Sequence, residues 1–105
     1  MATTVPQVMT MEASQVAVAP GTTEITEISA ENAYRRYLLI KNEGPNTIWI
    51  GWDDELLDED TGFQVLKDEY VEFTWPESMF KEALYAVADD LTDDCIVHVI
   101  EGTGV

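Results

Sequence analysis

The chain has 105 residues, 46% of them apolar, and its 21 acidic and five basic side chains give a net charge of −16 at pH 7. A chain of this length forms one domain with a single core, and its charge excludes nucleic acid and anionic membrane surfaces as partners, because both would repel it. The single cysteine, Cys95, excludes an intrachain disulfide and a metal site built from cysteines.

The first 13 residues are mostly small or polar and show no sustained hydrophobic period. We expect a flexible N-terminal arm over residues 1–13 and one folded domain over residues 14–105. No basic region precedes a continuous apolar run here, so the segment is not predicted to be a signal peptide. An alternative is that the arm orders against a neighbouring subunit through four apolar anchors, namely Val5, Val8, Met9 and Met11.

From residue 14 onward, short apolar segments with strand spacing alternate with turn residues and acidic loops. The predicted strands cover residues 14–19, 22–28, 37–41, 47–51, 62–66, 70–75, 83–88 and 95–101. About seven to eight short antiparallel strands, with no helix long enough to form a layer, predict an all-β fold. The expected architecture is a single-domain β-sandwich or a jelly-roll-like barrel.

The strands over residues 37–41 and 47–51 flank a Glu-Gly-Pro-Asn turn at residues 43–46, and we expect them to pair as a hairpin. In the second of these strands, Ile48 and Ile50 share one face while Trp49 takes the other. The loop that follows, residues 52–61, holds six carboxylates and is therefore expected to lie outside the core.

This acidic loop is the strongest candidate for a metal site, because calcium prefers oxygen ligands. Its candidate ligands are Asp53, Asp54, Asp58 and Asp60. The EF-hand spacing fails, since Phe63 stands where that motif requires glycine. We therefore favour a solvated acidic loop, apply the same interpretation to the acidic turn at residues 89–94, and predict no cofactor.

No group of residues points to catalysis. Strand alternation places His98, the single histidine, on the face opposite Cys95, which argues against a Cys–His pair. The six glycines fall at turns or ends rather than in a phosphate-binding loop. The sequence thus does not predict an enzyme.

Three tryptophans and two arginines remain as candidates for binding. Trp49, Trp52 and Trp75 could stack on sugars, although packing in a core or an interface is the commoner role of tryptophan in a small β domain. Arg35 and Arg36 precede the predicted hairpin in a chain that is poor in cations. We expect them to pair with acids of their own chain or of a neighbouring subunit, which makes them candidate subunit contacts.

Short landmarks follow one another along residues 35–102. They are Arg35-Arg36 before YLLIKNEG, then TIWIG, GFQVL, YVEFTW, ALYAVA and VHVIEG. In this order they resemble the landmarks of small β-sandwich virion proteins of tailed bacteriophages. One departure is the Lys-Asp-Glu sequence at residues 67–69, where that family usually has a Pro-Gly or Gly-Glu turn, so a tighter turn is expected to be missing. The long acidic loop after Gly51 is a second departure.

This resemblance implies a structural protein of the particle, located in the virion and assembled in the host cytoplasm. A capsid decoration (cement) protein fits best, because a single small domain with a free arm suits a protein that is added to a shell. The implied partners are the major capsid protein or other virion proteins, with a homotrimer as the favoured oligomer. The capsid or subunit contacts would be the arm anchors together with Arg35 and Arg36.

Two other functions stay open. One is a receptor- or glycan-binding module associated with a tail or head fibre, motivated by the three tryptophans. The other is an acidic DNA mimic that inhibits a nucleic-acid-binding enzyme, motivated by the charge of −16. The mimic ranks last, because the carboxylates concentrate in two loops rather than along one extended face.

Overall fold

The computed structural model describes residues 10–52, 57–58, 60–74, 81–89 and 93–104. Within these ranges the regular secondary structure is entirely β, and no helix there could cross a membrane. The strands are β1 (Thr10–Val18), β2 (Gly21–Ser29), β3 (Arg35–Gly44), β4 (Ile48–Gly51), β5 (Phe63–Val65), β6 (Tyr70–Thr74), β7 (Leu84–Ala88) and β8 (Cys95–Thr103).

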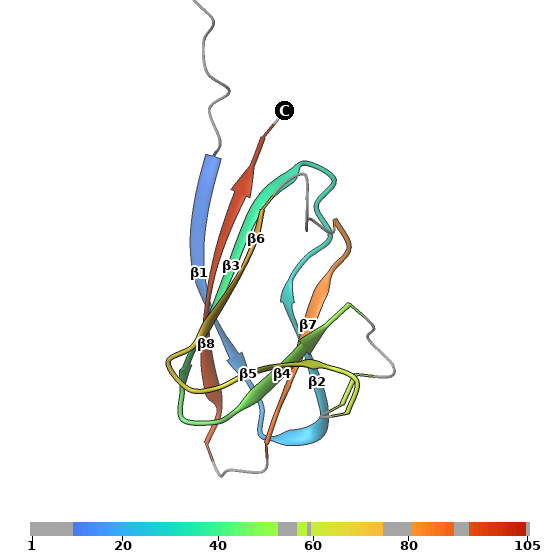
Figure 1. Cartoon of the computed structure of the whole chain (residues 1–105), viewed down its shortest axis with the longest axis vertical. Helices are drawn as coiled ribbons and strands as arrows, with labels where there is room; N and C mark the ends of the chain where they lie inside the picture. The colour runs from blue at the N-terminus through green and yellow to red at the C-terminus, as the bar shows by residue number, and fades with distance from the viewer. Residues whose placement is uncertain (1–9, 53–56, 59, 75–80, 90–92, 105) are drawn as a thin grey trace, which may run out of the picture.

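The strands of the described residues form two antiparallel four-stranded sheets (Figure 1). The β1 sheet has the order β1-β8-β3-β6, and the β2 sheet has the order β2-β7-β4-β5. Along the chain, each strand is followed by a strand of the other sheet, except that β4 and β5 are neighbours in one sheet. Two sheets connected in this way form a jelly roll, and the predicted all-β sandwich is confirmed.

The predicted hairpin is wrong, because β3 and β4 belong to different sheets. Both sides of β3 are taken by β6 and β8, and both sides of β4 by β5 and β7. The turn residues give the physical reason: Gly44 adopts a left-handed backbone (φ 84°), and Pro45 has no N–H with which to continue a strand ladder. The Glu-Gly-Pro-Asn segment therefore carries the chain from one sheet to the other.

The core lies between the sheets and follows the period of two that is expected of strands. In β4, Ile48 and Ile50 are buried while Trp49 faces away from them, as predicted. The buried apolar side chains that form one cluster are Val18, Ile28, Leu38, Ile40, Ile48, Ile50, Val65, Leu84, Ala86, Ala88, Cys95, Val97 and Val99.

Two segments differ from the sequence-based expectation. β1 begins at Thr10, so residues 10–13, which were assigned to the arm, pair with β8. The acidic loop contributes Leu57 to the interior, where the residue is only 5% exposed. Leu57 fits there because Gly51 and Gly62 lack side chains, and a Cβ on either glycine would lie 2.9 Å from Cδ1 of Leu57. A loop rich in carboxylates is therefore still anchored in the core.

The turn between β5 and β6 is tight, although residues 67–69 contain no glycine. The N–H of Glu69 donates to the carbonyl oxygen of Leu66 at 3.0 Å, and Asp68 adopts a left-handed backbone with φ 67°. Aspartate is one of the few residues other than glycine that tolerate this conformation. The tight turn that we expected to be missing is thus present.

Candidate functional site

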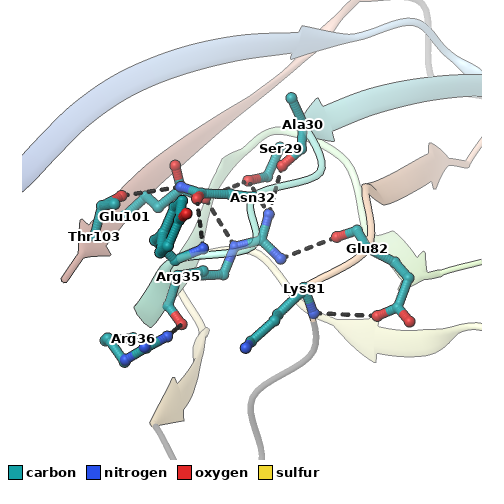
Figure 2. Close-up of polar contacts among 10 residues, drawn as sticks. Ser29, Ala30, Asn32, Arg35, Arg36, Lys81, Glu82, Glu101 and Thr103 are labelled. Atoms are coloured by element: carbon teal, nitrogen blue, oxygen red, sulfur yellow. Dashed lines mark hydrogen bonds and ion pairs between the residues drawn. The ribbon is translucent and has the colours of Figure 1, made fainter. Parts of the chain in front are cut away.

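Arg35 is the first residue of β3 and is completely buried. Its Nε donates to Oε2 of Glu101 in β8 at 2.7 Å, and its terminal nitrogens donate to the carbonyl oxygens of Glu82 (2.9 Å) and Ala30 (2.6 Å), as Figure 2 shows. The hydroxyl of Ser29 accepts a further hydrogen bond from Arg35 (3.0 Å) and donates to Glu101 (3.2 Å). We call these five residues the Arg35 network.

The Arg35 network joins the two sheets at one end of the sandwich. Ser29 ends β2 and Glu82 lies just before β7, whereas Arg35 and Glu101 belong to the β1 sheet. A buried guanidinium is tolerated only when its donors are satisfied, and this arrangement supplies a carboxylate, a hydroxyl and two carbonyl oxygens. Arg35 therefore links the two sheets through hydrogen bonds made inside the domain.

This burial changes the expectation for the arginine pair. Arg35 has no exposed surface to offer another subunit. Arg36 is half-buried, and its Nη1 donates to the carbonyl oxygen of Arg35 at 3.1 Å. Of the two candidate contact residues, only Arg36 reaches the surface. Among the predicted arm anchors, Met11 is an exposed residue of β1, while Val5, Val8 and Met9 lie outside the described residues.

A cleft of about 340 Å³ lies beside the Arg35 network, between the edge strands β5 and β6. Trp52 and Phe73 meet edge to face in it, with ring centroids 5.8 Å apart, and Cζ of Arg35 lies 6.0 Å from the centroid of the Trp52 ring. The lining is almost wholly apolar and consists of Ile50, Gly51, Trp52, Thr61, Phe63, Val71, Phe73 and Leu84. We call this feature the β5–β6 cleft.

Phe63 of this cleft is exposed although it faces the interior. It pairs with Ile50, which is 3% exposed, and directly paired residues of neighbouring strands share a face of the sheet. Phe63 is nevertheless 61% exposed. On β6, Val71 and Phe73 oppose buried residues of β3 and are themselves only half-buried. The described part of the chain thus leaves inward-facing apolar side chains uncovered on this side of the sandwich.

The described tryptophans do not form a common platform. Trp49 lies on the outward face of β4, whereas Trp52 packs against the core and lines the β5–β6 cleft. Trp75 lies outside the described residues. A sugar that stacked on Trp49 would therefore bind a different face of the domain from a sugar that stacked on Trp52.

Asp58, one of the candidate calcium ligands, is engaged in a local turn. Its Oδ1 accepts hydrogen bonds from the N–H groups of Asp60 and Thr61, both at 2.9 Å, and from the Thr61 hydroxyl at 3.1 Å. These bonds, with that from the Asp60 N–H first, lower the pKa of Asp58. Asp53 and Asp54 lie outside the described residues, and within those residues no three His, Cys, Asp or Glu side chains are grouped to hold a metal ion.

Cys95 and His98 lie on opposite faces of β8, as the alternation predicts. Cys95 is buried, its Sγ donates to Oδ1 of Asn42 at 3.0 Å, and burial raises the pKa of its thiol. His98 is part-exposed, with Nε2 2.7 Å from Nε2 of Gln15 and Nδ1 3.5 Å from Oε1 of Glu43. The two side chains therefore do not form a nucleophile–base pair.

Asn42 is a buried polar residue that the sequence analysis did not single out. Its Nδ2 donates to the carbonyl oxygens of Asn46 (2.7 Å) and Val65 (2.9 Å), and its Oδ1 accepts from the N–H of Gly44 (2.7 Å) and from Cys95. We call these five residues the Asn42 network. The sequence does contain a signal for the burial of Asn42. By strand alternation, Asn42 occupies the inward position that follows Leu38 and Ile40.

Comparison with known proteins supports the fold. No family model matches the chain, and no curated protein matches it. Among solved structures, the chain is similar to one described as "Bacillus endospore appendages form a novel family of disulfide-linked pili", with a TM-score of 0.54 and 10% identical residues. The similarity covers 100% of this chain and 96% of the other. At this identity, the likeness shows a shared fold alone.

Proposed function

We propose that the chain is a structural subunit of a virus particle, namely a phage capsid decoration (cement) protein that binds the assembled shell and stabilises it. The observation that carries the proposal is the β5–β6 cleft, where inward-facing apolar side chains stay uncovered within the described domain. Apolar surface of this kind is typical of a site that packs against another protein chain. The resemblance along residues 35–102 suggests the class of particle.

Three polar groups that could serve chemistry, those of Cys95, Arg35 and Asp58, have structural roles, which supports a protein without enzymatic activity. Cys95 is enclosed in the Asn42 network, and Arg35 is enclosed in the Arg35 network. Asp58 binds backbone N–H groups of its own turn. Stabilisation of a shell needs no catalysis, because a protein that binds only the assembled state shifts the equilibrium toward that state.

Co-sedimentation tests this proposal. Assembled shells of the source particle that lack this protein are mixed with it, pelleted, and heated to follow their rupture. We expect stoichiometric pelleting and a higher rupture temperature, with no binding to unassembled capsid protein as the matched control. Because a chain of charge −16 is attracted to a basic partner face, binding to such a face should weaken as salt is raised. A protein that stays in the supernatant at low salt would contradict the proposal.

A second candidate is a subunit of a fibre, which the similarity to the endospore appendage chain favours. The pili of that structure are described as disulfide-linked. Within the 105 residues of this chain the one cysteine is buried, so a fibre of this chain would not be joined by disulfides through Cys95. Filaments in electron micrographs of the concentrated protein, without binding to shells, would favour this candidate over decoration.

The two remaining alternatives have simple tests. A glycan-binding module should change its tryptophan fluorescence with at least one member of a glycan panel, since Trp49 lies on an outer face. A DNA mimic should compete with DNA for a nucleic-acid-binding enzyme in an electrophoretic assay. A response in either assay, with no binding to shells, would replace decoration as the proposed function.

A further inference from the structure

We propose that the β5–β6 cleft receives residues 1–9 of a second copy of this chain. The inference extends the proposed structural role and rests on it for its biological setting. Association of the purified chain with itself can be measured without any shell, so the two proposals can fail separately.

The acceptor is an apolar site at the edge of both sheets. Phe63 of β5 faces the interior but is 61% exposed, and Val71 and Phe73 of β6 face the same space. Among the strands of the described residues, β6 has one neighbour in its sheet, β3. A peptide that adds to such an edge in extended form directs every second side chain toward the sheet interior. Here those side chains would enter the cleft.

The donor segment has the composition that this cleft requires. Residues 1–9 include Val5, Pro6, Val8 and Met9, and residues 1–11 contain no charged side chain. All 21 acidic residues therefore lie between Glu12 and the end of the chain. Two copies of a domain with this charge repel each other, and an uncharged apolar segment is the part of one copy that approaches the other at the lowest electrostatic cost.

The positions of the donor and acceptor edges allow exchange between copies. β1 and β6 are the two outer strands of the β1 sheet, so they lie roughly 14 Å apart by the usual strand spacing. In the same molecule the segment would have to cross the end of the sandwich, where backbone hydrogen bonds tie Asn32 to Lys81 and Tyr34 to Gly104. Between two copies placed side by side, the β1 edge of one faces the β6 edge of the next. Nine extended residues, with a reach of about 30 Å, span that junction.

An exchange of this kind is head to tail, because the donor (residues 1–9) and the acceptor (the β5–β6 cleft) are different parts of the chain. Repetition of a head-to-tail contact closes a ring when the rotation between copies allows it, and otherwise extends a filament. A ring of three copies would match the trimer that the resemblance implies. The contact itself requires only that residues 1–9 of one copy extend to the β5–β6 cleft of the next copy.

The test uses three full-length variants in sedimentation velocity over a range of concentrations. The segment variant is the double change Val5→Asp and Met9→Asp, two positions that share one face of an extended segment, and the cleft variant is Phe63→Glu. The control is Tyr34→Glu, because Tyr34 is as exposed as Phe63 (59% against 61%) but does not line the cleft. We expect the segment and cleft variants to weaken self-association by about tenfold or more, and the control to leave it close to that of the wild type.

A mixture of the two defective variants separates exchange between copies from docking within one copy. The segment variant retains an intact cleft, and the cleft variant retains an intact segment. Mixed in equal amounts they should form a dimer that holds one contact and grows no further, although each variant alone associates only weakly. A monomeric wild type, an equal loss in the control, or a mixture that stays monomeric overturns the proposal. Cover of the cleft by the chain's own residues 75–80 would give such a result.

Discussion

The two ends of the sandwich are held by different polar chemistry on the same two strands. At one end, Arg35 of β3 binds Glu101 of β8, and at the other end Asn42 of β3 accepts a hydrogen bond from Cys95 of β8. Both β3 residues are fully buried, and both bind groups from the opposite sheet. One end therefore relies on a buried charge and the other on a buried neutral amide.

This difference predicts unequal sensitivity to substitution. A buried charge carries a large desolvation penalty, which its partners offset only while all of them are in place. A neutral amide costs less to bury and needs fewer partners. The charged end also carries the open β5–β6 cleft, since Trp52 lies beside Arg35, whereas at the other end Val65 and Cys95 are enclosed. Stability and the proposed contact surface are thus adjacent at the charged end.

The largest effect is expected for Arg35→Met. Loss of the guanidinium leaves Glu101 without its cation and the carbonyl oxygens of Ala30 and Glu82 without these donors. The free energy of unfolding should fall by about 3 to 5 kcal/mol, as for other broken buried ion pairs. Urea denaturation followed by tryptophan fluorescence measures this change.

The control for this prediction is Arg36→Met, which removes the same charge from a half-buried neighbour. The double variant Arg35→Met with Glu101→Met should be more stable than Arg35→Met alone, because it also removes the carboxylate that had lost its partner. Equal stability losses for Arg35→Met and Arg36→Met would show that net charge, and not the buried network, is responsible.

A smaller loss, about 2 to 3 kcal/mol, is expected for Asn42→Ala at the neutral end, because buried carbonyl and N–H groups lose their partners. These groups belong to Asn46, Val65 and Gly44. Asn32→Ala is the matched control, since Asn32 is only part-buried and donates to the Thr103 hydroxyl at 2.9 Å. If Asn42→Ala costs more than Arg35→Met, the charged end is not the more sensitive one.

The sequence predicted the faces of the strands better than their neighbours. Alternation correctly separated Ile48 and Ile50 from Trp49, and Cys95 from His98, because the period of a strand is a local property. It failed for the β3–β4 pair, because the strand that β3 pairs with depends on the β6 and β8 segments, which lie far along the chain. Periodicity tells which side chains share a face but not which sheet a strand joins.

The candidate site shows the same limit. The scarcity of cations made Arg35 conspicuous, yet its partners come from residues 29, 30, 82 and 101, which only the folded chain brings together. The β5–β6 cleft is likewise a property of two strands in different sheets. The burial of Leu57 was not predicted, because the acidic loop was interpreted from its overall composition. Such an argument misses a single apolar residue that reaches the core.

A still smaller effect is expected at Cys95. The thiol is a weak donor, so Cys95→Ser should cost only about 1 kcal/mol, as a hydroxyl can replace the bond to Asn42. Burial raises the pKa of the thiol and therefore reduces the thiolate fraction at any given pH. Labelling of Cys95 with a thiol reagent should be much slower in the folded protein than in urea. Equal labelling rates would show that the neutral end opens readily.

The smallest effect is expected in the middle of β3, where Tyr37 donates to Oε2 of Glu72 at 2.6 Å near the surface. This hydrogen bond to a carboxylate raises the pKa of Tyr37 to about 12, so the bond persists at neutral pH and is lost as the pH rises through that value. Glu72→Gln should lower this pKa toward 10, which carbon-detected NMR of the tyrosine ring can follow.

Tyr37→Phe should change the free energy of unfolding by no more than about 0.5 kcal/mol, because water replaces an exposed partner at little cost. The three sites then form a series along one strand: a buried charge, a buried amide and a hydroxyl near the surface. If Tyr37→Phe costs as much as Asn42→Ala, hydrogen bonding alone sets the energies. If Tyr37→Phe costs far less, the degree of burial explains why polar contacts at the ends of the sandwich contribute more to stability than the one in its middle.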